Sequence, residues 1–190
     1  GIAFRLQNPA VSTKNGCCAA QMFLDDGDGV VFLGEFGPWY APDTKQFHLK
    51  PEAARSLLQG VIKTYEDLHG KQLDEVFLHS RSGIDLDEYR GYCSAVSANT
   101  KVVAVRVRPN ATPFRLMRQG DWPVLRGTFL KVNEQRGFLW SSAFKPELAT
   151  YDGGDVPVPL YLEVQHGEAD IEQVAYDVYG LTKLNYSACK

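Results

Sequence analysis

One stretch decides the fold class: Glu75-Val76-Phe77-Leu78-His79-Ser80-Arg81-Ser82-Gly83, followed by Ile84-Asp85-Leu86-Asp87-Glu88-Tyr89-Arg90. Its apolar run, residues 76–78, is typical of a strand buried in the middle of a sheet. Residues 80–83 have the composition of a turn. Asp85 can cap a helix, and Glu88 three residues later completes a capping-box-like pair. The stretch therefore predicts a strand, a loop and a helix.

The end of this strand is the expected functional edge of the sheet. Open α/β sheets bind ligands at the carboxyl ends of their strands. Ser80 and Arg81 lie at this end, so we expect them to face a ligand crevice. No carboxylate occurs at this point in the sequence.

Three strands are expected before this stretch. We predict them at residues 2–6, 17–24 and 30–33, with the last two joined by the tight turn Asp25–Gly29. A loop over residues 34–50 follows. Pro51 then opens an amphipathic helix, and Gly70 ends it.

The helix that Asp85 caps should end near Ser97, and the sequence predicts further strands after it. Residues 100–108 alternate as a half-buried strand does, and residues 127–132 and 137–141 form a hairpin. A strand over residues 160–164 and a helix capped by Asp170 complete the chain. Three strands followed by βα units and a β insertion predict the ribonuclease H arrangement.

Composition indicates a globular domain that works without a structural metal. The 190 residues can bury one core, and no apolar run is long enough to span a bilayer. The four cysteines (Cys17, Cys18, Cys93, Cys189) form no CxxC pair, so we expect reduced thiols in a cytoplasmic protein. The histidines are scattered, and the acidic turn at 25–29 lacks the spacing of a calcium loop.

Charge is unevenly distributed although the net charge is only −3. Residues 101–145 hold nine basic and two acidic side chains, whereas residues 146–180 hold eight acidic ones and no Lys or Arg. This asymmetry favours one basic and one acidic face, with chance clustering as the alternative. Aromatic residues interleave with the basic block, which fits a nucleic-acid groove and a β-sheet core equally well.

Seven motifs together resemble the PIWI domain of short prokaryotic Argonautes. They are CCAAQMFL (17–24), GDGVVF (27–32), GPWY (37–40), PVLRGT (123–128), RGFLW (136–140), GEADIE (167–172) and LTKLNY (181–186). The resemblance covers nearly the whole chain. It implies an α/β, ribonuclease H-like PIWI fold with a mixed β-sheet flanked by helices. Residues 1–190 would be a partial PIWI domain, with a MID domain upstream and C-terminal strand elements expected outside the chain.

The resemblance also bears on catalysis. Active PIWI domains cut a guide-paired strand with carboxylates that hold two metal ions. The matching positions here are Ala3 and Ser80, and the third ligand would come from the region 48–51, where Glu52 is the only nearby carboxylate. Alanine and serine cannot replace carboxylates for hard cations. We therefore expect no catalytic residues, no metal site and no enzymatic activity, with a metal-dependent ribonuclease H-like nuclease as the alternative.

An inactive PIWI domain of this kind implies guided binding. It would hold a guide, expected to be RNA, paired to target DNA, and would activate a TIR-APAZ or sirtuin-like-APAZ effector that depletes NAD in defence against phages or plasmids. The chain has no Gly-rich dinucleotide motif, so NAD hydrolysis would belong to the partner. No cofactor is expected in this chain, and Mg²⁺ is expected only at the guide 5′-phosphate of the complete protein. No membrane association is expected.

Five residues are candidates for nucleic-acid contacts. The resemblance places Lys183 and Asn185 near guide phosphates, with a solvated helix end as the alternative. Arg81 is assigned to the guide or target backbone. Arg136 and Lys131 flank the second hairpin, where they could contact a phosphate, a partner subunit or only solvent. For Trp39 and Tyr40 we favour core packing over base stacking. A purely structural or partner-docking domain is a third interpretation.

Overall fold

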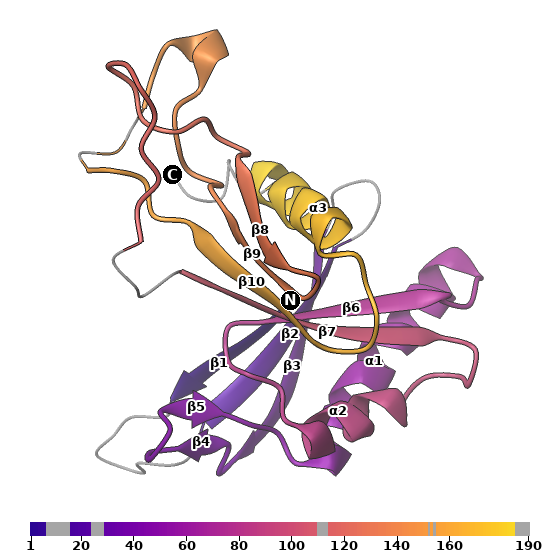
Figure 1. Ribbon diagram of the computed structural model, residues 1–190. Helices are drawn as coiled ribbons and strands as arrows, with labels where there is room; N and C mark the ends of the chain where they lie inside the picture. Colours follow the sequence, from indigo (N-terminus) through magenta and orange to yellow (C-terminus); the bar gives the residue numbers. More distant parts are fainter. Residues whose placement is uncertain (7–15, 24–28, 110–113, 152, 154, 185–190) are drawn as a thin grey trace. The chain divides into compact units, whose positions relative to one another are not determined.

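The computed structural model describes residues 1–6, 16–23, 29–109, 114–151, 153 and 155–184. The chain divides into two compact units, which are described separately (Figure 1). The first comprises Gly1–Arg106 and Gln165–Gly167, and the second comprises Val107–Val164 and Glu168–Lys190. The predicted turn at residues 25–28 and the candidate Asn185 lie outside the described residues.

The first unit contains a mixed sheet with the strand order β3-β2-β1-β6-β7. Its strands are β1 (Ile2–Leu6), β2 (Gly16–Phe23), β3 (Gly29–Gly37), β6 (Glu75–Ser80) and the beginning of β7 (Lys101–Pro109). The β1–β2 and β2–β3 pairs are antiparallel, whereas β1–β6 and β6–β7 are parallel. The predicted central strand, β6, therefore lies inside the sheet, as its apolar run requires.

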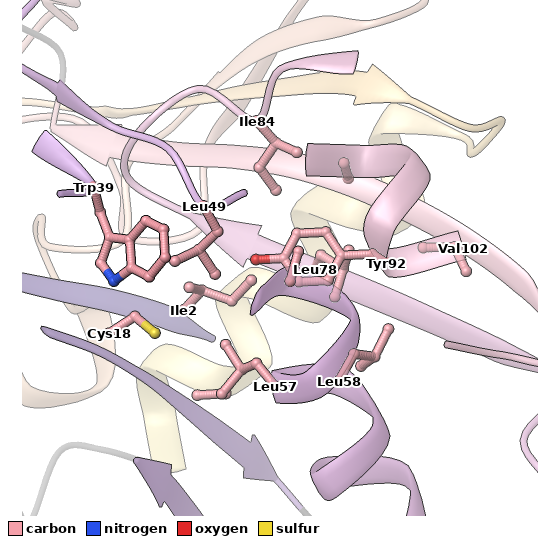
Figure 2. Close-up of a cluster of buried hydrophobic side chains, with 13 residues drawn as sticks. Ile2, Cys18, Trp39, Leu49, Leu57, Leu58, Leu78, Ile84, Tyr92 and Val102 are labelled. Atoms are coloured by element: carbon pink, nitrogen blue, oxygen red, sulfur yellow. The ribbon is translucent and has the colours of Figure 1, made fainter. Parts of the chain in front are cut away.

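Two helices pack together in this unit. Helix α1 (Pro51–His69) begins with a proline and ends at Gly70, whose φ of 64° is the left-handed conformation that glycine adopts readily. Helix α2 (Leu86–Cys93) begins after Asp85. Figure 2 shows Leu57 and Leu58 of α1 in one buried cluster with strand residues such as Ile2 and Leu78. Burying this apolar face is what stabilises the helices in place.

The second unit is built on an antiparallel sheet with the order β10-β9-β8. Its elements are β8 (Phe129–Asn133), β9 (Arg136–Leu139), the short 3-10 helix η1 (Pro146–Leu148), β10 (Leu160–His166) and α3 (Ile171–Leu184). The β8–β9 hairpin was predicted. Trp140 is fully buried, and its indole N–H donates to the carbonyl of Pro157 at 3.2 Å. Helix α3 contacts β8 and β9.

The structure confirms the fold class and corrects two boundaries. Strand β3 extends to Gly37, and β4 (Tyr40–Ala41) pairs with β5 (Gln46–Phe47), where a loop was predicted. The aromatic residues explain this, because Trp39 is buried, as predicted, and donates its indole N–H to the Glu35 carbonyl at 3.0 Å. Helix α2 ends at Cys93 and not near Ser97, since the hydroxyl of Ser94 binds the carbonyl of Gly91 at 2.7 Å.

No helix in the described part of the chain is long and apolar enough to cross a bilayer. Cys93 is a half-buried free thiol.

Candidate nucleic-acid interface

The two positions that the motif resemblance matches to catalytic carboxylates lie on neighbouring strands. Ile2 of β1 is paired with Ser80 of β6 in parallel register, so Ala3 is one residue from this pair. Ala3 is exposed, whereas Ser80 is only 3% exposed. The expectation that the Ser80 side chain faces an open crevice is therefore wrong, because the alternation of β6 turns it into the protein. Neither a methyl group nor a hydroxyl is the carboxylate ligand that hard cations prefer.

The loop after β6 is held by distant side chains. The amide oxygen of Gln46 accepts from Gly83 N–H at 3.3 Å, and that of Gln165 accepts from Ile84 N–H at 3.0 Å. The Nε2 atom of His166 lies 2.8 Å from the Ile84 carbonyl oxygen. Arg81 is exposed at the start of this loop, as its proposed role requires. The three supporting residues carry no sequence signal, because they come from segments far from the loop.

The first turn of α2 is only partly as predicted. Asp85 Oδ1 accepts from Glu88 N–H at 2.8 Å, which confirms the N-cap. The Glu88 side chain does not complete a capping box. It is 1% exposed, and its Oε1 accepts from the Tyr92 hydroxyl at 3.1 Å. Burial raises the pKa of Glu88 to about 8, Asp85 adds to this, and hydrogen bonds from Tyr92 and the Leu49 backbone oppose it.

Lys131 and Arg136 of the second hairpin have acidic partners. Lys131 Nζ lies 2.9 Å from Glu134 and 3.6 Å from Glu172, and the hydrogen bond to Glu134 is the main reason that its pKa is raised. Arg136 Nε donates to Glu163 at 2.9 Å. Glu172 and Glu163 of the acidic block therefore lie beside basic side chains here, so the two blocks are not wholly separate. A phosphate would have to compete with these carboxylates.

Lys183 lies exposed in the last turn of α3. Its Nζ is 4.4 Å from the centre of the Tyr179 ring, and the guanidinium carbon of Arg126 is 5.6 Å from the same ring. Arg126 Nε also donates to the Ser141 carbonyl at 2.9 Å. One aromatic ring thus holds two cations in the second unit. Arg126 was not among the predicted contacts, although it belongs to the basic block.

These observations define a ribonuclease H-like α/β fold of the PIWI class, with a mixed sheet flanked by helices. One solved structure that this chain resembles is the Argonaute of Clostridium butyricum bound to a guide DNA and a 19-mer target DNA. The TM-score is 0.64 at 17% sequence identity, over 96% of this chain and 23% of that protein. No family model and no curated protein match the sequence.

The chain therefore spans less than a quarter of that Argonaute. The likeness confirms the predicted fold. The roles of Arg81, Lys131, Arg136, Lys183 and Asn185 stay predictions, as do the domain boundaries and the absence of a cofactor.

Proposed function

We propose that this chain is the guide-directed nucleic-acid-binding module of a short prokaryotic Argonaute of the catalytically inactive type. The observation that carries this is the pairing of β1 with β6 in a ribonuclease H-like sheet, with Ala3 and Ser80 where carboxylates would be needed. The two-metal mechanism needs several anionic oxygens around the scissile phosphate. Without them at these positions, the sheet is a platform for a duplex and does not cut it.

The duplex would be recognised through its backbone and its shape, while base pairing reads the sequence. Lys183 and Arg126, which both lie close to the Tyr179 ring, are the cations of the second unit that we propose for a guide phosphate. Arg81 would contact the guide or target backbone from the loop after β6. Asn185 and, with their carboxylate partners displaced, Lys131 and Arg136 are further candidates.

The guide is proposed to be RNA and the target DNA, although the Clostridium butyricum relative is bound to DNA in both roles. A TIR-APAZ or sirtuin-like-APAZ partner would respond to target binding by depleting NAD, in defence against phages or plasmids. The motif resemblance described above supports this partner.

The test is a binding and cleavage assay with the intact protein. It is loaded with 5′-phosphorylated guide RNA or guide DNA and given a labelled complementary strand with Mg²⁺ or Mn²⁺. We expect retention of the matched strand, no retention of a scrambled strand, and no cut. Cleavage opposite the guide would establish the alternative, a metal-dependent nuclease. Absence of guide binding would instead favour a structural or partner-docking domain.

The effector step needs a separate measurement. NAD is followed after the intact complex, with its partner subunit, receives matched or scrambled target. Loss of NAD only with the matched target is expected. NAD consumption that ignores the target would contradict the proposed signalling while leaving guided binding intact.

A further inference from the structure

Three side chains that could bind a metal ion converge beside the first turn of α2. His48 comes from the segment between β5 and α1, Asp85 is the N-cap of α2, and Glu88 lies in its first turn. One ligand atom from each lies within 4.8 Å of the other two. The group belongs to the first unit and includes neither Ala3 nor Ser80.

The separations fit a shared cation better than direct hydrogen bonds. His48 Nδ1 lies 3.4 Å from Asp85 Oδ2 and 3.5 Å from Glu88 Oε2. Good hydrogen bonds between such atoms are about 2.7–3.2 Å long. Two ligands of a tetrahedral zinc ion, each about 2.1 Å from the metal, lie about 3.4 Å apart. The two measured separations therefore match two edges of such a tetrahedron.

A second observation points to a missing partner. Glu88 is only 1% exposed, and within the described residues neither its Oε2 nor His48 Nδ1 has a partner with good hydrogen-bond geometry, although both atoms are buried and the Leu49 backbone N–H lies near the Glu88 carboxyl. Buried polar atoms are nearly always satisfied, because an unsatisfied one keeps its full desolvation cost. A cation between these two atoms and Asp85 Oδ2 would satisfy all three.

The other atoms of the two carboxylates are already engaged, which fixes the orientation of the potential ligands. Asp85 Oδ1 accepts a hydrogen bond from Glu88 N–H, so Asp85 Oδ2 remains available to bind an ion between the three side chains. Glu88 Oε1 accepts a hydrogen bond from the Tyr92 hydroxyl, so Glu88 Oε2 remains available to the same ion. The backbone N–H of His48 donates to the Trp39 carbonyl at 2.9 Å. Metal sites in proteins are commonly held by such outer contacts.

We propose that His48, Asp85 and Glu88 form a site for one four-coordinate divalent metal ion of the zinc class. An imidazole nitrogen with two carboxylate oxygens suits Zn²⁺, whereas Mg²⁺ and Ca²⁺ take oxygen ligands. Two carboxylates also neutralise the ion, which removes the cost of leaving a net charge in the core. The Asp85 side chain is 51% exposed, so water can supply the fourth ligand from that side.

The proposed ion would connect the segment before α1 to the start of α2. Its role is therefore to fix these two segments relative to each other. The site does not depend on the proposed guided binding and includes neither Ala3 nor Ser80, although His48 lies in the region 48–51 that the resemblance matches to a third catalytic ligand. The alternative is a proton shared between Glu88 and His48 in place of the ion. In that case no metal would bind.

The experiment uses the intact protein after removal of metal with a chelator. Zn²⁺ is titrated against a chromophoric competitor, and Co²⁺ is used as a spectroscopic probe because tetrahedral Co²⁺ absorbs far more strongly in the visible range than octahedral Co²⁺. We expect one Zn²⁺ per chain, tetrahedral Co²⁺ bands that Zn²⁺ abolishes, and a higher Tm with Zn²⁺.

Three variants and one matched control locate the ion. His48→Gln, Asp85→Asn and Glu88→Gln should each raise the Kd for Zn²⁺ by at least about tenfold and remove the Co²⁺ bands. Asn still caps a helix, and Gln still accepts from Tyr92, so the fold should survive, as circular dichroism would verify. Asp87→Asn removes a carboxylate of the same turn whose side chain is 75% exposed, and it should change nothing.

Two results would overturn the proposal. One is the absence of stoichiometric Zn²⁺ binding at micromolar concentrations. The other is a Kd in Glu88→Gln equal to that of the unmodified protein, which would place the ion elsewhere.

Discussion

The hydroxyl of Tyr92 donates a hydrogen bond to Glu88 Oε1 at 3.1 Å inside the core of the first unit. Both residues are 1% exposed. Burial is the main cause that raises the pKa of Tyr92, so the phenol stays protonated and remains a donor at neutral pH. This bond fixes which oxygen of Glu88 faces His48, so it links the packing of α2 to the proposed metal site.

Loss of this hydroxyl should destabilise the protein. Tyr92→Phe leaves Glu88 Oε1 without its side-chain donor, and we expect the free energy of unfolding to fall by about 1–3 kcal/mol. Urea denaturation followed by circular dichroism measures it. Tyr65→Phe on α1, whose ring stacks on His69, is the control and should have little effect. Equal stability of the two variants would mean that the Tyr92 bond contributes nothing.

Gly91 of α2 lies directly against the backbone of Pro51 at the start of α1. A Cβ added there would lie 2.4 Å from the Pro51 carbonyl oxygen and 2.7 Å from its Cα. Gly91→Ala should therefore cost about 1–3 kcal/mol or more, because backbone cannot move aside easily. Gly60→Ala is the matched control, since nothing lies within 4 Å of its added Cβ, and it should stabilise α1 by up to about 1 kcal/mol. Thermal denaturation of both variants tests the predicted opposite signs.

His79 on β6 should make the protein sensitive to acid. Burial is the main cause that lowers its pKa from 6.5 to about 4. The stability that the neutral His79 side chain contributes is fully present above pH 6.5, where this side chain is neutral in both the folded and the unfolded chain. As the pH falls from 6.5 towards 4, only the unfolded chain takes up the proton, so stability declines by up to about 3 kcal/mol.

The measurement is the urea concentration at the midpoint of unfolding, determined at several pH values between 7 and 4.5. His79→Gln should flatten the decline, whereas His69→Gln, a change to an exposed side chain, serves as control. If the two variants retained the same slope as the unmodified protein, His79 would not be the group responsible.

Lys183 provides the test of the proposed interface. Lys183→Glu should weaken guide binding for all guide sequences alike and reduce the dependence of log K on log salt by at least about 1, because a phosphate contact releases a counterion. Filter binding at several salt concentrations measures both. Lys63→Glu, on an exposed position of α1, is the control for a change of two charges. An unchanged affinity in Lys183→Glu would remove this residue from the interface.

Much of the fold follows from local patterns. The apolar run before Ser80 predicted β6, Pro51 and Gly70 predicted the two ends of α1, and Asp85 predicted the cap of α2. These features act over a few residues, so a single sequence contains them in full. The β4–β5 pair was missed because its strands have two residues each and depend on packing around Trp39.

The contacts of the candidate site residues could be predicted from the sequence only in small part. For Lys131 and Arg136 the sequence left a phosphate, a partner subunit or only solvent open as contacts, and it did not indicate that Glu172 and Glu163 from other elements lie beside them. The pairing of Arg126 and Lys183 on Tyr179 joins residues more than fifty positions apart in the chain. Contacts of this kind have no periodicity or spacing by which they could be recognised.

The sequence by itself determined the order of the longer strands and of the three α-helices, and it determined that Ala3 and Ser80 carry no carboxylate. The side chains present are fixed by the chain alone. Tertiary structure decided what surrounds them. Ser80 is buried, and the Glu88 side chain lies beside His48 and Tyr92 and does not form the predicted capping box. The pKa of a carboxyl and its power to bind a cation depend on burial and neighbouring charge, which exist only once distant segments have packed together.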